Sequence, residues 1–430
     1  MGELSIRKSI LLIGNYPPPY GGIPVHLELL APYLVQQGWD VHVLAIKSKP
    51  NEAERIGDIT VHHQRLIDQW SKDDLYNLYV KNVWERRRRL SFVRQDREML
   101  NNCLSLAKRA EQIVTEHDIR VISSYHIFPA GLAGSWIARN SGLPLITTIF
   151  GEIYSQFDLH KRRRKDVEFV FKKSESLLSC SVHCAKSPEK LGLHAKVKAM
   201  HYGIETAAFS QDADVTEVRR RFGFTKVDKV VIFVGRMTRE MGLHILLESI
   251  PMALEVMPHL RFIIAGMRAE LLESALTLGD KYPKNVFVVC DVPREELPQY
   301  YAASTISVVP SINDRACLGL AAAEAMACGK PVIITNVGGG TEVVAEECGV
   351  WLPPGNPGAL AKSILDLIND NASIERMGRL GRLRAVEYFD KELVNQRMEL
   401  IFNQALATSF RNTQWLYWLR SFGVKRTLRR

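Results

Sequence analysis

Residues 310–333 read PSINDRACLGLAAAEAMACGKPVI, and they continue from an apolar stretch at 306–310 that is typical of a buried strand. Gly319 precedes a run rich in alanine, the best helix former, and Gly329 stands where helices commonly end. The pattern predicts a short helix that begins beside a glycine and carries one acidic residue, Glu324. The N–H groups at a helix N-terminus favour an anion, and a carboxylate accepts hydrogen bonds from hydroxyls. We therefore expect a ligand with phosphate and hydroxyl groups, while a Glu324 that only complements the helix dipole remains the alternative.

The composition is that of a globular protein. Apolar residues make up 46% and charged residues 24% of the 430 residues, which is enough chain for two domains. The longest apolar runs are far shorter than the roughly 20 residues of a membrane span, and the N-terminal run reads as a strand because no cleavage site follows it. The net charge of +9 predicts an anionic partner, for which nucleic acid, anionic lipid and a diphosphate all qualify.

The cysteines indicate a reducing compartment. Seven of them, an odd number in a long chain, argue against a disulfide framework. Cys180, His183 and Cys184 lie close together, but no second ligand pair stands at zinc spacing. We therefore interpret the cysteines as buried thiols and expect no metal site.

The first half of the chain has the pattern of a parallel sheet. A strand at 10–13, a glycine loop with Gly21 and Gly22, a helix at 26–37 and a strand at 41–46 form one strand–helix–strand unit. Later strands at 121–125 and 144–150 end beside His126 and Gly151-Glu152. Because parallel strands present their carboxyl ends at one edge, we expect these polar groups to share a rim of the sheet, with Glu152 either contacting a ligand or solvated.

A second set of alternating elements follows. Its strands are predicted at 230–234, 261–265, 286–289, 306–310 and 332–335, with helices at 243–257, 295–303 and 358–370 between and after them. The sequence therefore predicts two doubly wound α/β domains at 1–205 and 206–390. C-terminal helices and a basic, aromatic tail are expected at 391–430.

Several segments together resemble the retaining, GT-B-fold glycosyltransferases of family 4, over nearly the whole chain. They are the proline-rich loop with its two glycines, the strand-end His126, FVGRMTREMG at 233–242, the stretch at 310–333, and NVGGGTEVV to CGVWLPPGNP at 336–357. The resemblance implies a GT-B fold of two facing Rossmann-like domains with parallel sheets and a cleft that holds a nucleotide-sugar. The N-terminal domain is expected to bind the acceptor, the C-terminal domain the nucleotide-sugar, and the last helix to cross back.

The resemblance also implies roles for individual residues. Arg236 matches the arginine that clamps the donor diphosphate, and His126 matches the histidine beside the reacting carbon, so both are expected to be catalytic. Glu324 matches the glutamate that binds the ribose hydroxyls. The other expected nucleotide-sugar-binding residues are Gly21, Gly22, Gly235, Gly319 and Leu320.

Three positions depart from the family pattern. Met241 replaces the family's lysine, Ala316 replaces the first glutamate of the pair that Glu324 completes, and Phe150 replaces a histidine. The candidate substitutes for the missing groups are Arg239, Asp314 and Arg315. Because of these departures, a non-catalytic partner subunit that binds a nucleotide or a sugar remains the alternative to an enzyme.

The implied chemistry needs no cofactor and no metal ion. The donor is expected to be UDP- or GDP-linked, and the leaving phosphate itself is expected to accept the proton of the acceptor. Something positive must meet the charge that develops on this phosphate. Substitution of Arg236 or Glu324 by alanine is expected to lower transfer more than tenfold and to leave the fold intact.

Basic runs suggest where the protein acts. The runs at 86–89 and 161–165 lie beside aromatic residues, and the tail at 415–430 combines aromatic and basic residues. Solvated helix faces remain an alternative for each run, but their clustering favours an anionic membrane. We expect a cytoplasmic enzyme at the inner face of the cell membrane, with a lipid-linked or oligosaccharide acceptor, in polysaccharide or glycoconjugate synthesis. No nucleic-acid-binding module is recognisable.

Overall fold

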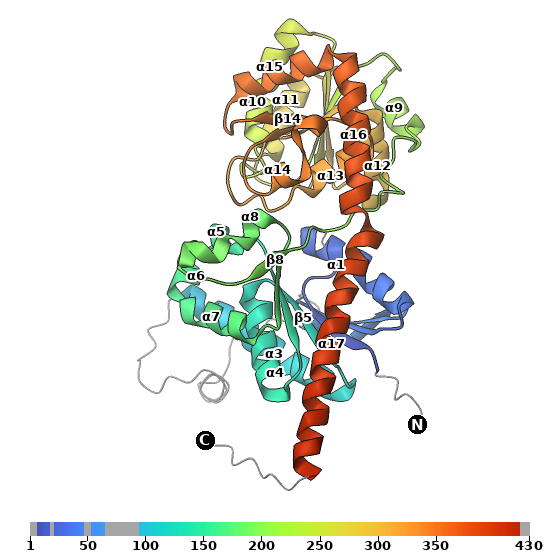
Figure 1. Cartoon of the computed structure of the whole chain (residues 1–430). Helices are drawn as coiled ribbons and strands as arrows, with labels where there is room; N and C mark the ends of the chain where they lie inside the picture. The colour runs from blue at the N-terminus through green and yellow to red at the C-terminus, as the bar shows by residue number, and fades with distance from the viewer. Residues whose placement is uncertain (1–6, 18–20, 47–52, 65–93, 422–430) are drawn as a thin grey trace. The chain divides into compact units, whose positions relative to one another are not determined.

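The computed structural model describes residues 7–17, 21–46, 53–64 and 94–421. The chain divides into two compact units (Figure 1). Unit 1 comprises 1–179, 185–198 and 395–430, and unit 2 comprises 180–184 and 199–394. The predicted basic run at 86–89 and the side chains of the C-terminal tail lie outside the described residues.

Unit 1 is built on an eight-stranded sheet with the order β3-β4-β2-β1-β5-β6-β7-β8. The strands at its centre pair in parallel, whereas β3 and β4 form an antiparallel hairpin at one edge. The sheet thus has the predicted parallel core and an edge hairpin that the sequence analysis did not predict. The strands are β1 (Ser9–Ile13), β2 (Asp40–Ile46), β3 (Ala53–Ile56), β4 (Ile59–Gln64), β5 (Val121–Tyr125), β6 (Leu145–Ile149), β7 (Ser176–Ser179) and β8 (Val197–Ala199).

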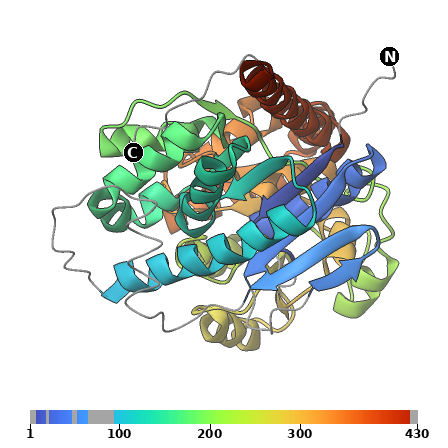
Figure 2. The same ribbon diagram turned by 90° about the horizontal axis from the view of Figure 1, so that it is seen from below.

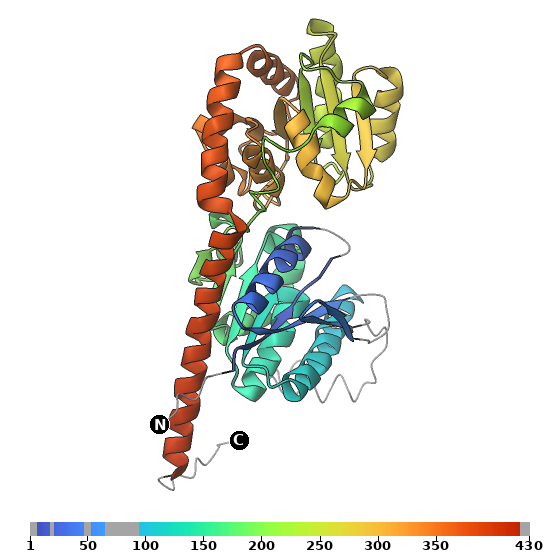
Figure 3. The same ribbon diagram turned by 90° about the vertical axis from the view of Figure 1, so that its right-hand side faces the viewer.

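Helices cover both faces of this sheet (Figures 2 and 3). Helices α3 (Arg94–Glu116) and α4 (Leu132–Ser141) bury apolar side chains against β1, β5 and β6. On the other face lies α1 (Gly22–Gln36), which buries Leu27, Leu30 and Leu34 at helical spacing. Burial of these apolar stripes is the main force that holds such layers together.

The C-terminal helix α17 (Lys391–Ser421) lies beside α1 (Figures 1 and 3). Its Glu399 accepts a hydrogen bond from Trp39 at 3.2 Å and pairs with Lys8 at 3.3 Å. Asn395 donates to the Leu29 carbonyl at 3.0 Å. From residue 395 onwards this helix therefore belongs structurally to the N-terminal part of the chain.

Unit 2 is built on a six-stranded sheet with the order β11-β10-β9-β12-β13-β14. All of its strand pairs are parallel, as predicted. The strands are β9 (Val230–Val234), β10 (Arg261–Gly266), β11 (Val286–Cys290), β12 (Ile306–Val309), β13 (Val332–Thr335) and β14 (Gly349–Leu352). The helices are α9 (Thr216–Phe222), α10 (Leu243–Val256), α11 (Leu272–Lys281), α12 (Leu297–Ala303), α13 (Leu320–Ala327), α14 (Gly340–Val343), α15 (Pro357–Ile368) and α16 (Asn371–Phe389).

The basic run at 161–165 spans a break between two short helices and is largely engaged within the protein. The backbone leaves helical geometry at Arg163, between α6 (Phe157–Arg162) and α7 (Arg164–Lys173), and buried Arg163 pairs with buried Asp166. Arg162 pairs with Asp96 at 3.0 Å, and Arg164 donates to the carbonyl of Leu191 at 2.8 Å. Three of the basic side chains at 161–165 thus have internal partners, which weakens their interpretation as a membrane-docking surface. Among the described residues, no helix has both the length and the apolar character that crossing a bilayer requires.

Candidate functional site

The strand order of unit 2 places a ligand site at one edge of its sheet. Numbered in chain order, the strands read 3-2-1-4-5-6, so successive strands are added towards one edge up to β11 and towards the other edge from β12 onwards, and the switch lies between β9 and β12. Open α/β sheets bind ligands outside the carboxyl ends of the strands at such a switch point. The loops that leave these two strands are 235–242 and 310–319, which contain most of the site residues expected in this half.

Glycines allow these loops to pack backbone against backbone. Gly242 has a φ of 74°, and a Cβ atom there would lie 1.7 Å from the Pro310 carbonyl oxygen. Gly338 has a φ of 61°, and its Cβ would lie 2.0 Å from the carbonyl oxygen of Ala316. The Ala316 carbonyl also accepts a hydrogen bond from the N–H of Gly339 at 2.9 Å. The loops after β9, β12 and β13 therefore form one connected frame.

Arg236 is an exposed cation in this frame. It follows β9 directly after Gly235, its side chain is 53% exposed, and its guanidinium lies 3.7 Å from the Glu240 carboxylate. A guanidinium in this position can bind phosphate oxygens through two N–H groups. Arg239 is also exposed, and its backbone N–H donates to the Glu270 carboxylate at 2.7 Å.

Met241, at the position of the family's lysine, packs against the apolar core of unit 2. Its side chain supplies no charge to this edge of the sheet. The loop residues Asp314 and Arg315, which are the candidate substitutes beside Ala316, are exposed, and the Arg315 N–H is bonded to the Asn313 side chain at 3.0 Å. Both are therefore accessible to a ligand.

Helix α13 begins as predicted. Gly319 has a φ of 78°, in the left-handed region that favours glycine, and no side chain caps the helix at Leu320. An N-terminus without a side-chain cap leaves helix N–H groups for solvent or a ligand. Gly319 and Leu320 thus lie at the predicted place, at the end of the loop after β12.

Glu324 is more deeply buried than its predicted role requires. It is 5% exposed, and one carboxylate oxygen lies 2.9 Å from Arg294 while the other lies 3.3 Å from the Tyr301 hydroxyl. Burial raises the pKa of Glu324, and its contacts with Arg294 and Tyr301 oppose that rise. Each carboxylate oxygen keeps a second lone pair for a ligand hydroxyl. This geometry leads us to expect that Glu324→Ala lowers the stability of the fold, because it would leave Arg294, whose side chain is only 13% exposed, without its carboxylate.

Two residues that the sequence pattern did not indicate complete the unit 2 site. Arg294 follows β11 at the same carboxyl edge and lies over the ring of Phe209 at 5.4 Å. Glu342 accepts hydrogen bonds from the backbone N–H groups of Val182 and His183, both at 2.7 Å, and so holds the segment 180–184 within unit 2. From the sequence, Arg294 could have been indicated by its position after a strand, whereas no such signal indicates Glu342.

In unit 1 the corresponding switch point lies between β1 and β5. Gly21 and Gly22, at the start of α1, are exposed, and a Cβ atom at Gly22 would meet nothing within 4 Å among the described residues. Packing therefore does not require glycine at position 22. A glycine without a packing reason is consistent with a loop whose backbone a ligand approaches closely. His126 follows β5 with an unusual φ of 79° and a side chain that is 39% exposed.

Glu152 holds the backbone around His126. Its carboxylate accepts hydrogen bonds from the N–H groups of Ile127 at 3.1 Å and Phe150 at 2.5 Å, and lies 3.5 Å from His126. The two strand ends thus share a rim as predicted, but the alternative of a solvated Glu152 is wrong because only 7% of the residue is exposed. Phe150 packs on His126, with ring centroids 4.7 Å apart.

The hydrogen bonds of the buried Glu152 carboxylate predict how a Glu152→Gln variant behaves. Burial alone would raise the pKa of Glu152, but His126 and hydrogen bonds outweigh it, so the pKa lies below its ordinary value of 4.5. The stabilisation is therefore present above about pH 4.5 and is lost as the pH falls through the folded-state pKa. We expect Glu152→Gln to lower the free energy of unfolding by about 1–3 kcal/mol at pH 7 and by clearly less near pH 4. Urea unfolding at both pH values measures this change in the free energy of unfolding, and Asp158→Asn, at an exposed position, is the control. An equal loss of stability at the two pH values would contradict a stabilising charge on Glu152.

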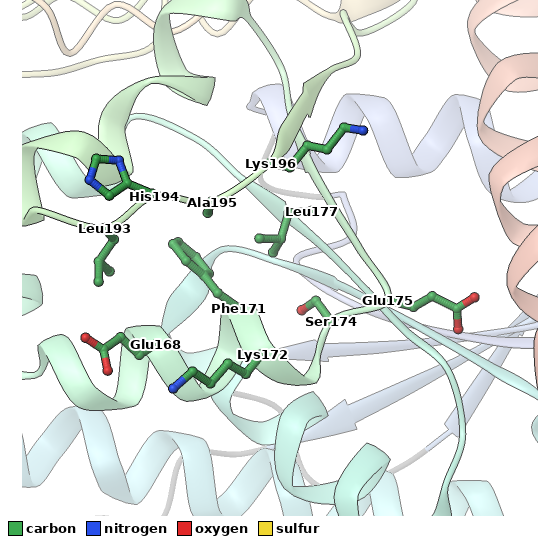
Figure 4. A pocket seen from close by; sticks show the side chains of 10 residues that line it. All are labelled: Glu168, Phe171, Lys172, Ser174, Glu175, Leu177, Leu193, His194, Ala195 and Lys196. Atoms are coloured by element: carbon green, nitrogen blue, oxygen red, sulfur yellow. The ribbon is translucent and has the colours of Figure 1, made fainter.

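The pocket in Figure 4 is not part of this site. It has a volume of about 500 Å³, and its side chains come from α7, the start of β7 and the segment before β8, including Phe171, Ser174 and Lys196. These segments enter their strands there, so the pocket lies at the amino edge of the sheet, opposite the edge that carries His126. Ligand sites of open α/β sheets lie at the carboxyl edge.

Two family models match the two halves of the chain. The family models "Glycosyltransferase Family 4" and "Glycosyl transferases group 1" match residues 20–208 and 214–384. An uncharacterized glycosyltransferase of Methanocaldococcus jannaschii is 26% identical over 84% of this chain and 89% of its own length. The GDP-mannose-dependent alpha-(1-6)-phosphatidylinositol monomannoside mannosyltransferase of Mycolicibacterium smegmatis is 23% identical over 88% of this chain and 94% of its own.

Solved structures confirm the predicted fold class of two parallel-sheet α/β domains. Sucrose-phosphate synthase from Thermosynechococcus elongatus has a TM-score of 0.73 at 20% identity, covering 94% of this chain and 100% of its own. HepE from Anabaena in complex with UDP has a TM-score of 0.70 at 18% identity, covering 92% of this chain and 100% of its own. The two family models together match most of the sequence and confirm the family: the chain belongs to the group 1 glycosyltransferases of the family 4 type and is a glycosyltransferase.

Proposed function

We propose that the protein transfers a sugar from a nucleoside diphosphate sugar to a lipid-linked or glycan acceptor, with retention of the anomeric configuration. The observation that carries the proposal is the exposed Arg236 at the switch point of unit 2, in a frame shared with Gly319 and the start of α13. A diphosphate that leaves the sugar gains negative charge on its bridging oxygen. A fixed guanidinium and a helix N-terminus stabilise such charge without reorganisation.

The roles of the other residues follow from this placement. Glu324, oriented by Arg294, accepts hydrogen bonds from the ribose hydroxyls of the donor. His126, held over the rim of its own sheet by Glu152, contacts the donor sugar. Because Met241 leaves the diphosphate without the usual lysine, Arg236 carries a larger share of the phosphate contact, and Arg239 or Arg315 supplies the rest.

The proposed reaction needs no protein nucleophile. The bond between the anomeric carbon and the phosphate oxygen breaks, and a bond to the acceptor oxygen forms on the same face of the sugar. The acceptor proton passes to the departing phosphate, which balances the step. The protein contributes position and electrostatic stabilisation, which are the largest catalytic effects in transfers of this kind.

A panel of nucleotides tests the donor class. Two of the similar proteins point to different bases, since the mycobacterial mannosyltransferase is GDP-mannose-dependent and HepE was solved with UDP. We expect the melting temperature to rise with the nucleoside diphosphate of one base and its sugars, by the equivalent of roughly 2.7 kcal/mol at 100 times the Kd. Turnover must then appear with one of these sugars and a suitable acceptor. Tight binding without turnover of any donor would indicate a binding subunit instead.

The acceptor and the location are part of the same proposal. The mycobacterial relative is named for a phosphatidylinositol mannoside acceptor, and this chain carries a net charge of +9. We propose that the protein acts at the cytoplasmic face of the membrane, bound to anionic lipid. Co-sedimentation with vesicles of phosphatidylglycerol, compared with phosphatidylcholine alone, checks this. Equal binding to both vesicles, or binding to neither, would exclude an anionic membrane surface as a partner.

A further inference from the structure

Three cysteines from two distant parts of the sequence meet in unit 2. Cys180 follows β7, Cys184 lies in α8 (Val182–Ala185), and Cys317 lies in the loop after β12, next to Ala316. Their sulfur atoms all lie within 4.8 Å of one another. Cys180 and Cys184 are buried, whereas Cys317 is half-buried. None of the seven cysteines, all of which the structure describes, forms a disulfide.

We propose that Cys180, Cys184 and Cys317 bind one thiophilic metal ion, Zn²⁺ in the first place, through three thiolates. Sulfur ligands select Zn²⁺ or Cu⁺ over Mg²⁺ and Ca²⁺, which prefer oxygen. Three protein ligands leave the fourth tetrahedral position of Zn²⁺ open for water or another group. Each thiol loses its proton as it binds the ion, so binding releases protons.

The surrounding hydrogen bonds already hold the three sulfur atoms in place. The His183 imidazole is bonded to the Asp314 carbonyl at 2.9 Å, which joins the segment 180–184 to the loop of Cys317. The Cys184 N–H donates to the Ser181 hydroxyl at 3.1 Å. Together with the contacts of Glu342 to this segment, these bonds set the ligand positions before any ion arrives, which lowers the ordering cost of binding.

Hydrogen bonding between the thiols, or a disulfide, accounts for the cluster less well than a metal ion does. A thiol is a weak hydrogen-bond donor and acceptor, so three thiols gain little from contacting one another. A disulfide uses two sulfur atoms and would leave the third without a role, whereas an ion uses all three. The half-buried side of Cys317 gives an ion a route to the two buried thiols.

The ion would tie the segment 180–184 to the loop that carries Ala316. If the proposed function is correct, that loop faces the donor sugar, so the ion would fix the part of the site in which the family glutamate is missing. The metal site itself does not depend on that function, because its test measures binding and not transfer.

Metal binding by the reduced, metal-free, untagged chain tests the proposal. A second group, His42, His62 and His117, has nitrogen atoms within the same distance limit, so the test must report sulfur ligands specifically. Cd²⁺ does so, because thiolate-to-cadmium charge transfer absorbs in the ultraviolet. We expect one equivalent of Cd²⁺ to produce this ultraviolet absorption band. Added Zn²⁺ should displace the Cd²⁺ and remove the band.

Variants then assign the ligands. We expect Cys317→Ser and Cys184→Ser each to weaken binding by at least about 100-fold, since loss of an outer partner alone costs 10- to 100-fold. Cys290→Ser is the matched control, because Cys290 is also half-buried and lies in unit 2 at the end of β11. It should bind like the wild type. Far-ultraviolet circular dichroism shows whether each variant is folded.

Hydrogen exchange gives an independent readout. We expect Zn²⁺ to slow exchange at both 180–184 and 313–318 in the wild type, and at neither segment in Cys317→Ser. Absence of the cadmium band in the folded, reduced wild type would overturn the proposal. So would a band that survives both serine variants. If the reduced protein binds no ion but oxidation joins two of the three cysteines, the cluster is a redox pair and not a metal site.

Discussion

Replacing Arg236 with alanine is expected to lower kcat/KM for sugar transfer by roughly 10- to 100-fold. A hydrogen bond to a charged phosphate contributes about 1.5–3 kcal/mol, and each 1.4 kcal/mol corresponds to tenfold in rate. The structure offers no second cation at the lysine position, because Met241 packs into the apolar core. The stability of the variant should stay within about 0.5 kcal/mol of the wild type, since the side chain is 53% exposed and its guanidinium lies as far as 3.7 Å from the Glu240 carboxylate.

The matched control for this experiment is Arg239→Ala. Arg239 is also exposed and lies in the same loop, but it is expected to contribute only part of the contact that the missing lysine would make. Steady-state kinetics over a range of donor concentrations separates the two effects. If Arg236→Ala keeps full activity while Arg239→Ala loses it, the assignment of the diphosphate clamp is wrong.

The second large effect is expected at Glu324, and it concerns stability as well as activity. Removal of one partner from a buried ion pair costs about 3–5 kcal/mol, because the other charge stays in a low-dielectric environment. Glu324→Ala leaves Arg294, whose side chain is only 13% exposed, in this situation. We therefore expect a loss of stability of this size in urea unfolding, together with a loss of nucleotide binding.

A double variant distinguishes the two roles of Glu324. In Glu324→Leu/Arg294→Met both charges are replaced by apolar groups of similar size, which often restores the stability that a single substitution loses. We expect the double variant to be more stable than Glu324→Ala and still unable to bind the nucleoside diphosphate. Nucleotide binding by the stable double variant would show that Glu324 has a purely structural role. A wild-type melting curve for Glu324→Ala would contradict the buried pair.

Much of the fold could be predicted because several strands of the two sheets are short, largely apolar runs. Parallel strands buried on both faces give such runs, and the strands predicted at 230–234 and 332–335 have the observed bounds. The edge hairpin of β3 and β4 was not predicted, because the exposed β3 has the polar sequence AERI. The break between two helices at Arg163 was not predicted either, because the sequence around it contains no proline or glycine.

Only those site residues could be predicted whose position is indicated by residues close to them in the sequence. Residues that directly follow strands, such as Arg236 and His126, are indicated by the strand pattern itself. Arg294, the partner of Glu324, lies 30 residues away in the chain. Glu342 accepts a hydrogen bond from the N–H of Val182, which lies 160 residues away. No local pattern contains such contacts. The third cysteine of the cluster escaped for the same reason, because spacing rules consider only ligands that are close in sequence.

The glycine contacts at the carboxyl edge of unit 2 bear on how this enzyme could acquire a new substrate. At Gly242, Gly266 and Gly338 the backbones of adjacent loops touch, and any Cβ atom would overlap a carbonyl group. These positions are closed to variation, so mutation cannot reshape the wall of the site there. By contrast, Asp314 and Arg315 in the loop after β12 are exposed. If the proposed function is correct, substitutions at these two positions can change which sugar is accepted, while the glycine-packed frame that would hold the nucleotide stays as it is.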